Sequence, residues 1–311
     1  MLCISCFFKL QINRKSPLTI LLTFKWRLRK MQICTLTDFQ IVAYKQYLQK
    51  EERSNGTVEK YLRDIRSFLR FLNGRAVTKE LTALWKEELL ARGYAPVTVN
   101  TMLSALNSLF TFLGCEEYRV KFLKIQRKLF RERSRELTKE EYRKLVTAAK
   151  SLGKERLALL IETICATGIR VSEVRYITTE AVRRGRAEIF LKGKIRVILL
   201  SAKLCRKLLK YAAKERIASG ALFRTKNGKE IGRRQIWAEL KRLCIPAEVE
   251  PSKVFPHNLR HLFATIFYKA CKDMARLADL LGHSSIETTR IYLVSSGEEQ
   301  RRQLDKLGLI L

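Results

Sequence analysis

The sequence predicts a mainly α-helical protein with two domains, the second a mixed α/β domain that is mostly helical with a small antiparallel sheet. Two segments before residue 115 repeat apolar residues at the helical period. Between residues 187 and 200 the pattern changes to two short runs rich in β-forming residues. Helical patterns resume at Ala202, and a length of 311 residues suits two domains.

The first domain is expected to be a helical bundle within residues 31–117. A helix from Val58 to Leu72 shows one apolar face, with Thr57 as its predicted N-cap. Another follows Pro96 and is closed by Gly114. Weaker helices near 38–49 and 78–92 complete the bundle. Its outer surface carries basic side chains that are either an ordinary solvated face or a DNA-backbone contact: Lys60, Arg63, Arg66 and Arg70.

The overall charge indicates a polyanionic partner. The chain has 62 Lys and Arg against 30 Asp and Glu, a formal net charge of +32. Self-repulsion of this size is typical of proteins that bind nucleic acid, here double-stranded DNA, with affinity that falls as salt rises. A membrane partner is not favoured, because no run of about 18 apolar residues is present. The eight cysteines are mostly scattered singly, which favours reduced thiols in a cytoplasmic protein.

Two basic segments flank the first domain. Residues 1–30 contain seven basic and no acidic residues and do not form a convincing signal peptide, so we hypothesise that this leader is not translated and that Met31 is the natural start. Within this leader, Cys3 and Cys6 form a lone CxxC without a second ligand pair. Residues 118–137 contain eight basic and two acidic residues and are expected to be a linker, suited to phosphate backbones but also typical of an exposed connector.

The second domain is expected over residues 138–311, opening with a capping box between Thr138 and Glu141. An apolar helix over 153–166 ends near Gly168, so Arg170 lies at a helix junction. The β-forming runs 187–191 and 196–200 predict a hairpin whose connection, residues 192–195, contains two lysines and Gly193.

All three histidines of the chain fall within one late stretch, together with an arginine and a tyrosine: His257, Arg260, His261, His283 and Tyr292. On a helix beginning near Asn258, the first three of these share roughly one face. The HxxxH spacing resembles part of a zinc motif, but Asn258 stands where a zinc hydrolase has its glutamate, and a guanidinium repels a cation. Arginine instead offers a bidentate fork for phosphate, so the stretch predicts a phosphate-handling active site with no metal and no cofactor.

His283 is expected to lie between two helix ends. Gly282 should cap a helix that Asp273 opens, and Ser284 should form a capping box with Glu287 at the start of the next helix. That helix carries Tyr292, which alone would be a packing residue. Beside cations, however, a phenol can act as a nucleophile toward phosphorus.

Together these motifs resemble the tyrosine recombinase (phage integrase) family, including its Xer-type members. The resemblance rests on ATGIRVSE at 166–173, HNLRH at 257–261, LGH at 281–283 and Tyr292, and it covers residues 37 to about 300. It implies a SAM-like core-binding domain followed by a tyrosine-recombinase catalytic domain. The hairpin turn is shorter than the family's commoner GKGxKxR form, and Leu199 stands where proline is frequent.

The resemblance also implies a chemistry. Tyr292 would attack the scissile phosphate, giving a 3′-phosphotyrosyl DNA intermediate and a free 5′-hydroxyl, without ATP or metal. Arg170 and Arg260 would grip the non-bridging oxygens, and His257 and His283 would donate hydrogen bonds and assist proton transfer. Lys192, or alternatively Lys194, would protonate the leaving 5′ oxygen. The supporting residues would be Glu173, which orients Arg170 or a nearby helix, and His261, which is either a helper or a packing histidine.

Two alternative functions share part of this pattern, and the C-terminal end of the chain suggests further partners. A catalytically inactive DNA-binding protein of the same fold is disfavoured by the complete residue set, whereas a type IB topoisomerase-like enzyme would use the same chemistry. The apolar end of the C-terminal tail, residues 309–311, is unfavourable unless it docks. The resemblance implies that such a tail packs on a neighbouring protomer, and hence a homo-oligomer, a tetramer, on DNA. Accessory DNA-bending proteins and an association with the nucleoid are further expectations.

Overall fold

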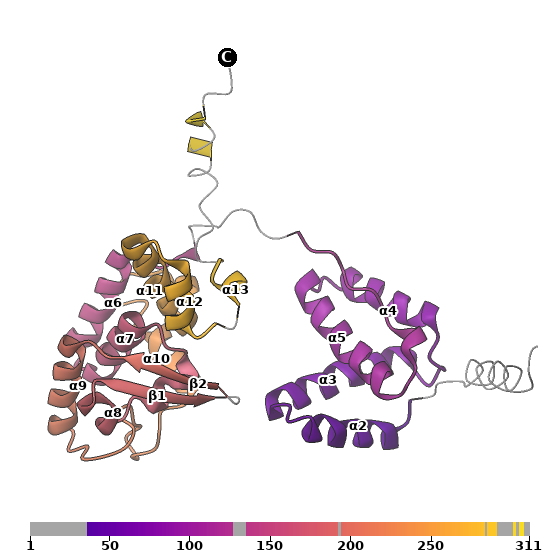
Figure 1. Ribbon diagram of the computed structural model, residues 1–311, viewed down its shortest axis with the longest axis horizontal. Coiled ribbons are helices and arrows are strands. Elements are labelled where there is room, and N and C mark those ends of the chain that lie inside the picture. The colour runs from indigo at the N-terminus through magenta and orange to yellow at the C-terminus, as the bar shows by residue number, and fades with distance from the viewer. Residues whose placement is uncertain are drawn as a thin grey trace, which may run out of the picture. The chain divides into compact units, whose positions relative to one another are not determined.

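The computed structural model describes residues 36–126, 135–191, 194–283, 285–290, 301–302 and 305–307. It divides into two compact units, Met1–Gln126 and Arg127–Leu311 (Figure 1). The leader with its CxxC and Met31, the middle of the basic linker, Lys192, Gly193, Ser284 and Tyr292 lie outside the described residues.

The first unit contains four α-helices among its described residues: α2 (Asp38–Lys50), α3 (Asn55–Leu72), α4 (Lys79–Ala91) and α5 (Pro96–Phe112). The predicted cap of α3 is wrong by one turn. Ser54 is the N-cap, and its Oγ accepts from the Thr57 backbone N–H, so Thr57 lies inside the first turn. Asparagine and serine both favour caps over helix interiors, and the sequence SNGT offered several candidates in succession.

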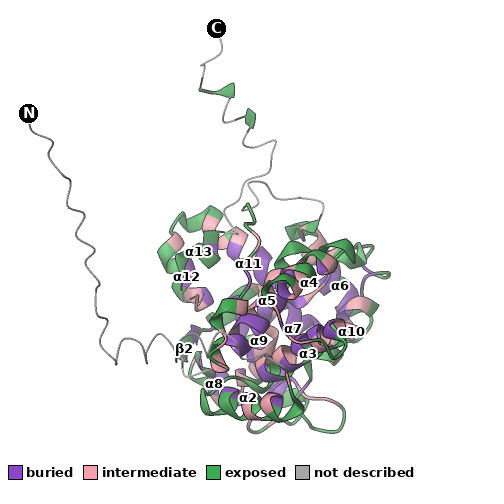
Figure 2. Ribbon diagram, turned by 90° about the vertical axis from the view of Figure 1, so that its right-hand side faces the viewer, coloured by how far each residue is buried: buried purple, intermediate pink, exposed green. Residues whose placement is uncertain are grey.

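Aromatic side chains fill the core of this unit. Phe68, Trp85 and Phe110 are almost completely buried, and the ring of Phe68 meets Trp85 edge to face at 5.0 Å between centroids. Tyr44 is also buried, and its hydroxyl donates to Ser108 Oγ over 2.8 Å. These contacts hold α2, α3, α4 and α5 in one bundle, with their buried residues on the inward faces (Figure 2).

The first residues of the basic linker lie against α5. Asn107 accepts from the Val120 N–H and donates to the Val120 carbonyl, both over 2.9 Å. Asn100 makes the equivalent pair with Leu123, at 2.8 and 2.9 Å. Two asparagine side chains spaced seven residues apart therefore supply this extended backbone with the hydrogen bonds that a neighbouring strand would otherwise provide.

The second unit begins with a helix hairpin. Helix α6 (Lys139–Ser151) starts at the predicted capping box of Thr138 and Glu141, and α7 (Glu155–Thr167) ends at Gly168. A 3₁₀ helix, η3 (Val171–Tyr176), and the short α8 (Thr179–Arg183) follow. Helices α9 (Ala202–Lys214), α10 (Arg233–Arg242), α11 (Pro256–Cys271), α12 (Met274–Leu281) and α13 (Ile286–Arg290) complete the described helices of this unit.

The predicted hairpin is present as β1 (Arg186–Leu191) and β2 (Lys194–Leu199), and its connection is shorter than expected. Leu191 pairs with Lys194, so only residues 192 and 193 join the strands, and Lys194 belongs to the strand instead of the turn. Ala187, Ile189 and Ile198 face the core. This small antiparallel sheet on a helical unit matches the predicted fold class.

Helix α7 runs through the middle of the second unit. Leu160, Ile161 and Ile164 are almost fully buried, and α11 packs along α7. Among the residues that the structure describes, no helix combines the length and apolar character that crossing a membrane requires.

Candidate active site

The junction after α7 positions Arg170. Gly168 ends the helix with a left-handed φ of 64°, and Arg170 then stands as the residue before η3. Its backbone N–H donates to Glu173 Oε2 over 2.7 Å, and its Nη1 donates to Glu173 Oε1 over 2.9 Å. Nη2 reaches the carbonyl of Gly282 at 3.3 Å. The side chain of Arg170 keeps 39% of its surface exposed, so it can contact a ligand while Glu173 fixes its orientation.

Only glycine fits at position 168. A Cβ at this residue would lie 2.4 Å from the ring of Phe263, on α11. The backbone of the junction therefore lies directly on α11, and the Gly168 carbonyl accepts from Arg260 Nη1 over 2.6 Å. The close approach makes this carbonyl a fixed acceptor for the second arginine.

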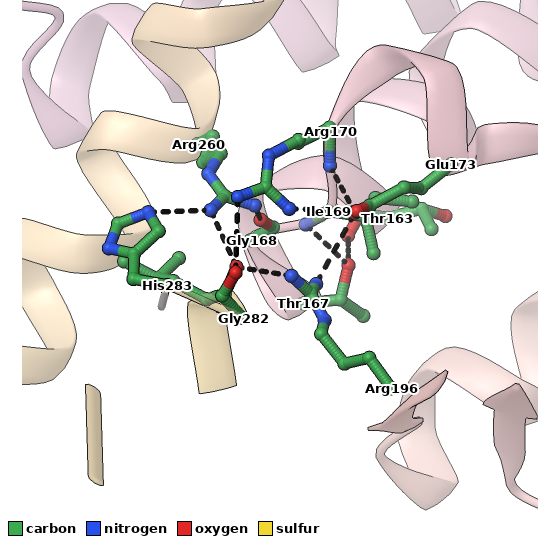
Figure 3. A network of polar contacts seen from close by, with 11 residues as sticks. Thr163, Thr167, Gly168, Ile169, Arg170, Glu173, Arg196, Arg260, Gly282 and His283 are labelled. Carbon is green, nitrogen blue, oxygen red and sulfur yellow. Dashed lines mark hydrogen bonds and ion pairs between the residues drawn. The ribbon is translucent and has the colours of Figure 1, made fainter. Parts of the chain in front are cut away.

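Arg260 is buried at 2% exposure. Helix α11 begins at Pro256, two residues earlier than predicted, because proline suits the first turn of a helix, where its missing N–H costs nothing. Besides Gly168, Arg260 Nη2 donates to the Leu281 carbonyl over 2.7 Å and lies 3.0 Å from His283 Nε2. A buried guanidinium is thus aimed at the end of α12 (Figure 3).

His283 lies between two helix ends, as predicted. Gly282 ends α12 with a left-handed φ of 61°, and the His283 N–H donates to the Ala278 carbonyl over 3.0 Å. The next helix, α13, begins at Ile286, and the amide of Glu287 donates to Ser285 Oγ; the predicted cap, Ser284, lies outside the described residues.

The hydrogen bonds of His283 assign its tautomer. A guanidinium can only donate, so Nε2 accepts from Arg260 and Nδ1 carries the proton, which it donates to Thr289 Oγ1 over 2.9 Å. Burial, and then the nearby charges of Arg260, Arg170 and Arg196, lower the pKa of His283 to about 4. The imidazole is therefore neutral near pH 7.

A third arginine completes the network, and sequence reasoning missed it. Arg196 on β2 donates from Nη2 to Glu173 Oε2 over 3.3 Å and from Nη1 to the Leu281 carbonyl. Its side chain is only 11% exposed. The available signal was an arginine inside a β-forming run, two residues beyond Lys194. Figure 3 shows Arg170, Arg196 and Arg260 converging on the backbone around Gly282.

The remaining predicted residues fall into two groups. His257 is exposed, and its ring meets the buried His261 at 6.5 Å between centroids. Their rings are therefore neighbours on α11. Tyr292 and Lys192, the predicted nucleophile and acid, lie outside the described residues.

The charge of the assembled site favours an anion. Arg170, Arg196 and Arg260 share one network, in which the carboxylate of Glu173 pairs with Arg170 and Arg196. Glu173 is itself buried at 1% exposure. Phosphate is a suitable ligand because guanidinium groups bind it with paired hydrogen bonds and keep their charge at all relevant pH values.

Comparison with known proteins gives the family. The model of the phage integrase family matches residues 135–299, and that of the phage integrase N-terminal SAM-like domain matches residues 41–117. The Tyrosine recombinase XerA of Thermococcus kodakarensis is 30% identical over 282 residues, covering 87% of this chain and 95% of the relative. The Tyrosine recombinase XerC of Roseiflexus castenholzii is 31% identical over 281 residues, covering 81% of this chain and 88% of the relative.

Solved structures show the same fold. A lambda integrase dimer bound to a COC' core site aligns with a TM-score of 0.67 at 17% identity, covering 88% of this chain and 84% of that chain. The XerH site-specific recombinase bound to palindromic difH substrate aligns with a TM-score of 0.63 at 19% identity, covering 87% of this chain and 94% of that chain. The chain therefore belongs to the phage integrase family of tyrosine recombinases, enzymes of site-specific recombination.

Proposed function

We propose that this recombinase cuts and rejoins double-stranded DNA with Tyr292 as its nucleophile. The observation that carries the proposal is the convergence of Arg170 and Arg260, from segments far apart in the chain, on the backbone at Leu281 and Gly282. This places two guanidiniums beside His283, nine residues before Tyr292 in the sequence. A phosphodiester held there would present its phosphorus to a nucleophile from the segment that follows His283 in the sequence.

In the proposed first step, Tyr292 passes its phenolic proton to His257 or to water, its oxygen forms a bond to phosphorus, and the bond from phosphorus to the 5′ oxygen breaks. The leaving oxygen takes a proton from Lys192, with Lys194 as the alternative donor. Arg170 and Arg260 stabilise the charge that develops on the non-bridging oxygens. A 5′-hydroxyl from a second strand then returns its proton to the lysine and attacks the phosphorus of the phosphotyrosyl group, and the tyrosine leaves and regains its proton. Each of the two steps replaces one phosphodiester bond by another, so the strand exchange requires no nucleotide cofactor.

Histidines would assist from both sides of the phosphate. His257, exposed at the start of α11, can donate a hydrogen bond to a phosphate oxygen. His283 is neutral, and its Nε2 accepts from Arg260, so its first role would be to align Arg260. Donation from Nε2 to the phosphate would require the proton to move to that nitrogen when DNA displaces the arginine contact. Glu173 would orient Arg170, and His261 would support the ring of His257.

The domain roles follow from charge and family. We assign DNA clamping to residues 31–117, backbone contacts to the linker 118–137, and catalysis to residues 138–311. In the first unit, Arg66 and Arg70 are exposed and have no ion pair among the described residues, which suits contact with a DNA backbone. Lys60 and Arg63, by contrast, share the buried carboxylate of Asp64, which reduces the positive charge that they offer.

The proposed partners extend to other copies of the chain. Solved structures of the same fold include a lambda integrase tetramer bound to a Holliday junction. Strand exchange between two duplexes needs four cleavage events, so a homotetramer on DNA is proposed here as well. An association with nucleoid DNA in the cytoplasm, assistance from accessory DNA-bending proteins, and docking of the C-terminal tail on a neighbouring protomer are part of the same proposal.

Covalent capture tests the proposed chemistry. Random double-stranded DNA with single nicks is incubated with the protein, and DNA that becomes covalently attached is recovered and sequenced to define the site. The cognate suicide substrate should trap wild-type protein but not Tyr292→Phe. As a matched control, Tyr94→Phe removes an exposed hydroxyl from the first unit and should still form the adduct.

The same assay separates the alternative functions. Binding of DNA by the wild type without any adduct would support an inactive DNA-binding protein and would refute the proposal. An adduct that relaxes supercoiled DNA without exchanging strands between two sites would indicate a type IB topoisomerase-like enzyme. Recombinant joints between two labelled duplexes are the expected result.

A further inference from the structure

Arg196 connects the two halves of the arginine network. One of its terminal nitrogens, Nη2, donates to Glu173 Oε2 at 3.3 Å, and the other, Nη1, donates to the Leu281 carbonyl. Glu173 holds Arg170, whereas the Leu281 carbonyl also accepts from Arg260. Arg196 therefore contacts both the residue that orients Arg170 and an acceptor of Arg260.

At the first end, Arg196 compensates a buried carboxylate. Glu173 is 1% exposed, and a carboxylate so far from water needs more than one charged or N–H partner. Oε1 is bound to Arg170 Nη1, and Oε2 is shared between the Arg170 backbone N–H and Arg196. Without Arg196, the ion pair between Glu173 and the Arg170 guanidinium, the group proposed to bind phosphate, would be stronger.

At the second end, the stem of Arg196 lies on the backbone before His283. A Cβ on Gly282 would lie 2.4 Å from Arg196 Cδ and 2.6 Å from Nη1. This contact and the left-handed φ of 61° both favour glycine at position 282, so the stem of Arg196 on β2 lies directly against the end of α12. The carbonyl of Leu281 then stands between two guanidiniums, those of Arg196 and Arg260.

We propose that Arg196 is a positioning residue that holds Arg170 and Arg260 at the separation at which both can bind one phosphate. The inference rests on the proposed function. Arg196 is assigned a positioning role because its two Nη atoms are bound to Glu173 and to the Leu281 carbonyl, the groups that also hold Arg170 and Arg260, and its side chain is 11% exposed. Its Nε is buried and has no hydrogen-bond acceptor among the described residues. A fixed separation matters because a misplacement of about 1 Å can lower a reaction rate by about 100-fold.

The first test compares two substitutions at this position. Arg196→Gln removes the charge, and Arg196→Lys keeps the charge on an ammonium that reaches one acceptor at a time. Both variants should form the covalent adduct about 100-fold more slowly than the wild type at saturating DNA. Their affinity for DNA should change little. Arg186→Gln is the matched control, because Arg186 lies exposed at the base of the same hairpin and pairs with Glu188; it should react at the wild-type rate.

A second substrate distinguishes positioning from a general loss of structure. Replacing one non-bridging oxygen of the scissile phosphate by a methyl group removes the negative charge that Arg170 and Arg260 are proposed to hold. On this methylphosphonate, the difference between wild type and Arg196→Lys should shrink, because alignment of the two guanidiniums then matters less. A loss of structure would slow both substrates by the same factor.

Each outcome decides the inference. A wild-type rate in Arg196→Lys would show that charge alone suffices and would overturn it, as would an equal loss on phosphate and methylphosphonate. Should Arg196→Gln fail to fold, Arg196→Lys carries the comparison, and its melting temperature is measured alongside. Absence of any adduct from the wild type is a different result, because it refutes the proposed function and not the role of Arg196.

Discussion

Arg260 Nη2 donates to His283 Nε2 over 3.0 Å, which makes the imidazole a hydrogen-bond acceptor at that atom. The other ring nitrogen, Nδ1, donates to the buried Thr289, so both ring nitrogens are hydrogen-bonded to other residues of the protein. A cation on one side and burial on the other oppose protonation of the ring. The pKa of His283, lowered to about 4, follows from this environment.

The first prediction is a loss of stability in acid that depends on His283. In the unfolded chain the pKa of a histidine is about 6.5, whereas the pKa of His283 in the folded protein is about 4. Between these values the unfolded state binds a proton that the folded state refuses, so the free energy of unfolding falls as pH falls through this window. His283→Gln should lose less stability than the wild type over the same range, as measured by urea unfolding.

Nuclear magnetic resonance gives an independent check on that histidine. With three histidines in the chain, the signal missing from His283→Gln assigns His283. The chemical shift of its ring protons should stay constant from about pH 7 to about pH 5. A titration centred near the ordinary histidine pKa would contradict the accepting role of Nε2.

The second prediction separates backbone strain from close packing at Gly168. Gly153 and Gly168 have nearly the same left-handed φ, 66° and 64°, but only Gly168 has a side chain against its Cα, the ring of Phe263. Gly153→Ala should therefore cost only the left-handed strain, about 1 kcal/mol. Gly168→Ala should cost about 3 kcal/mol, because overpacking adds to the strain. Equal losses in thermal unfolding would show that the Phe263 ring moves aside freely.

The third prediction concerns the asparagines on α5. Asn107→Leu should lower the free energy of unfolding by about 3 kcal/mol, because it leaves the N–H and the carbonyl of buried Val120 without partners. Asn100→Leu is the matched comparison and should cost less, because its bonds to Leu123 are only partly buried and water can replace them. A larger loss at Asn100 in urea unfolding would refute this ranking.

The fourth prediction tests the entry to the second unit. Asn258 Nδ2 donates to the carbonyls of Arg135 and Lys253, over 3.0 and 2.7 Å, and the side chain is buried. Asn258→Asp keeps the shape but turns an acceptor toward both carbonyls. It should therefore destabilise by more than Asn258→Ala, which costs about 2 kcal/mol for the lost bonds. The reverse order in calorimetry near pH 7 would show that the two bonds do not hold this segment.

Local signals accounted for the helices and several of their ends. The capping box at Thr138 and the terminal glycines 168 and 282 depend on residues adjacent in sequence, and they lie where the sequence predicts. Thr57 was wrong as a cap because Ser54, one turn earlier, competes for the same role. Helix ends are set by short-range hydrogen bonds, which is why sequence patterns predict them to within a turn.

In the hairpin, the alternation of apolar and other residues along β2 does not predict which face of the strand is buried. Ile195, Val197 and Leu199 form the apolar face of β2, yet they are 70%, 50% and 70% exposed. Arg196 instead shares the inward face with Ile198, because a buried acceptor, Glu173, stands opposite it. An ion pair with a distant residue decided which face of the strand is buried, and no local pattern reports that partner.

The sequence by itself determined the fold class, the family motifs and the residue types of a phosphate site, because these depend on periodicity and on short motifs in a fixed order. The tertiary structure alone decided how the site is assembled. Arg170 reaches Gly282 across 112 residues, Arg260 reaches Gly168 across 92, and Arg196 reaches Leu281 across 85. Such bonds exist only because α7, α11 and β2 pack around the backbone at Leu281 and Gly282, and packing depends on the whole core instead of on neighbours in the chain.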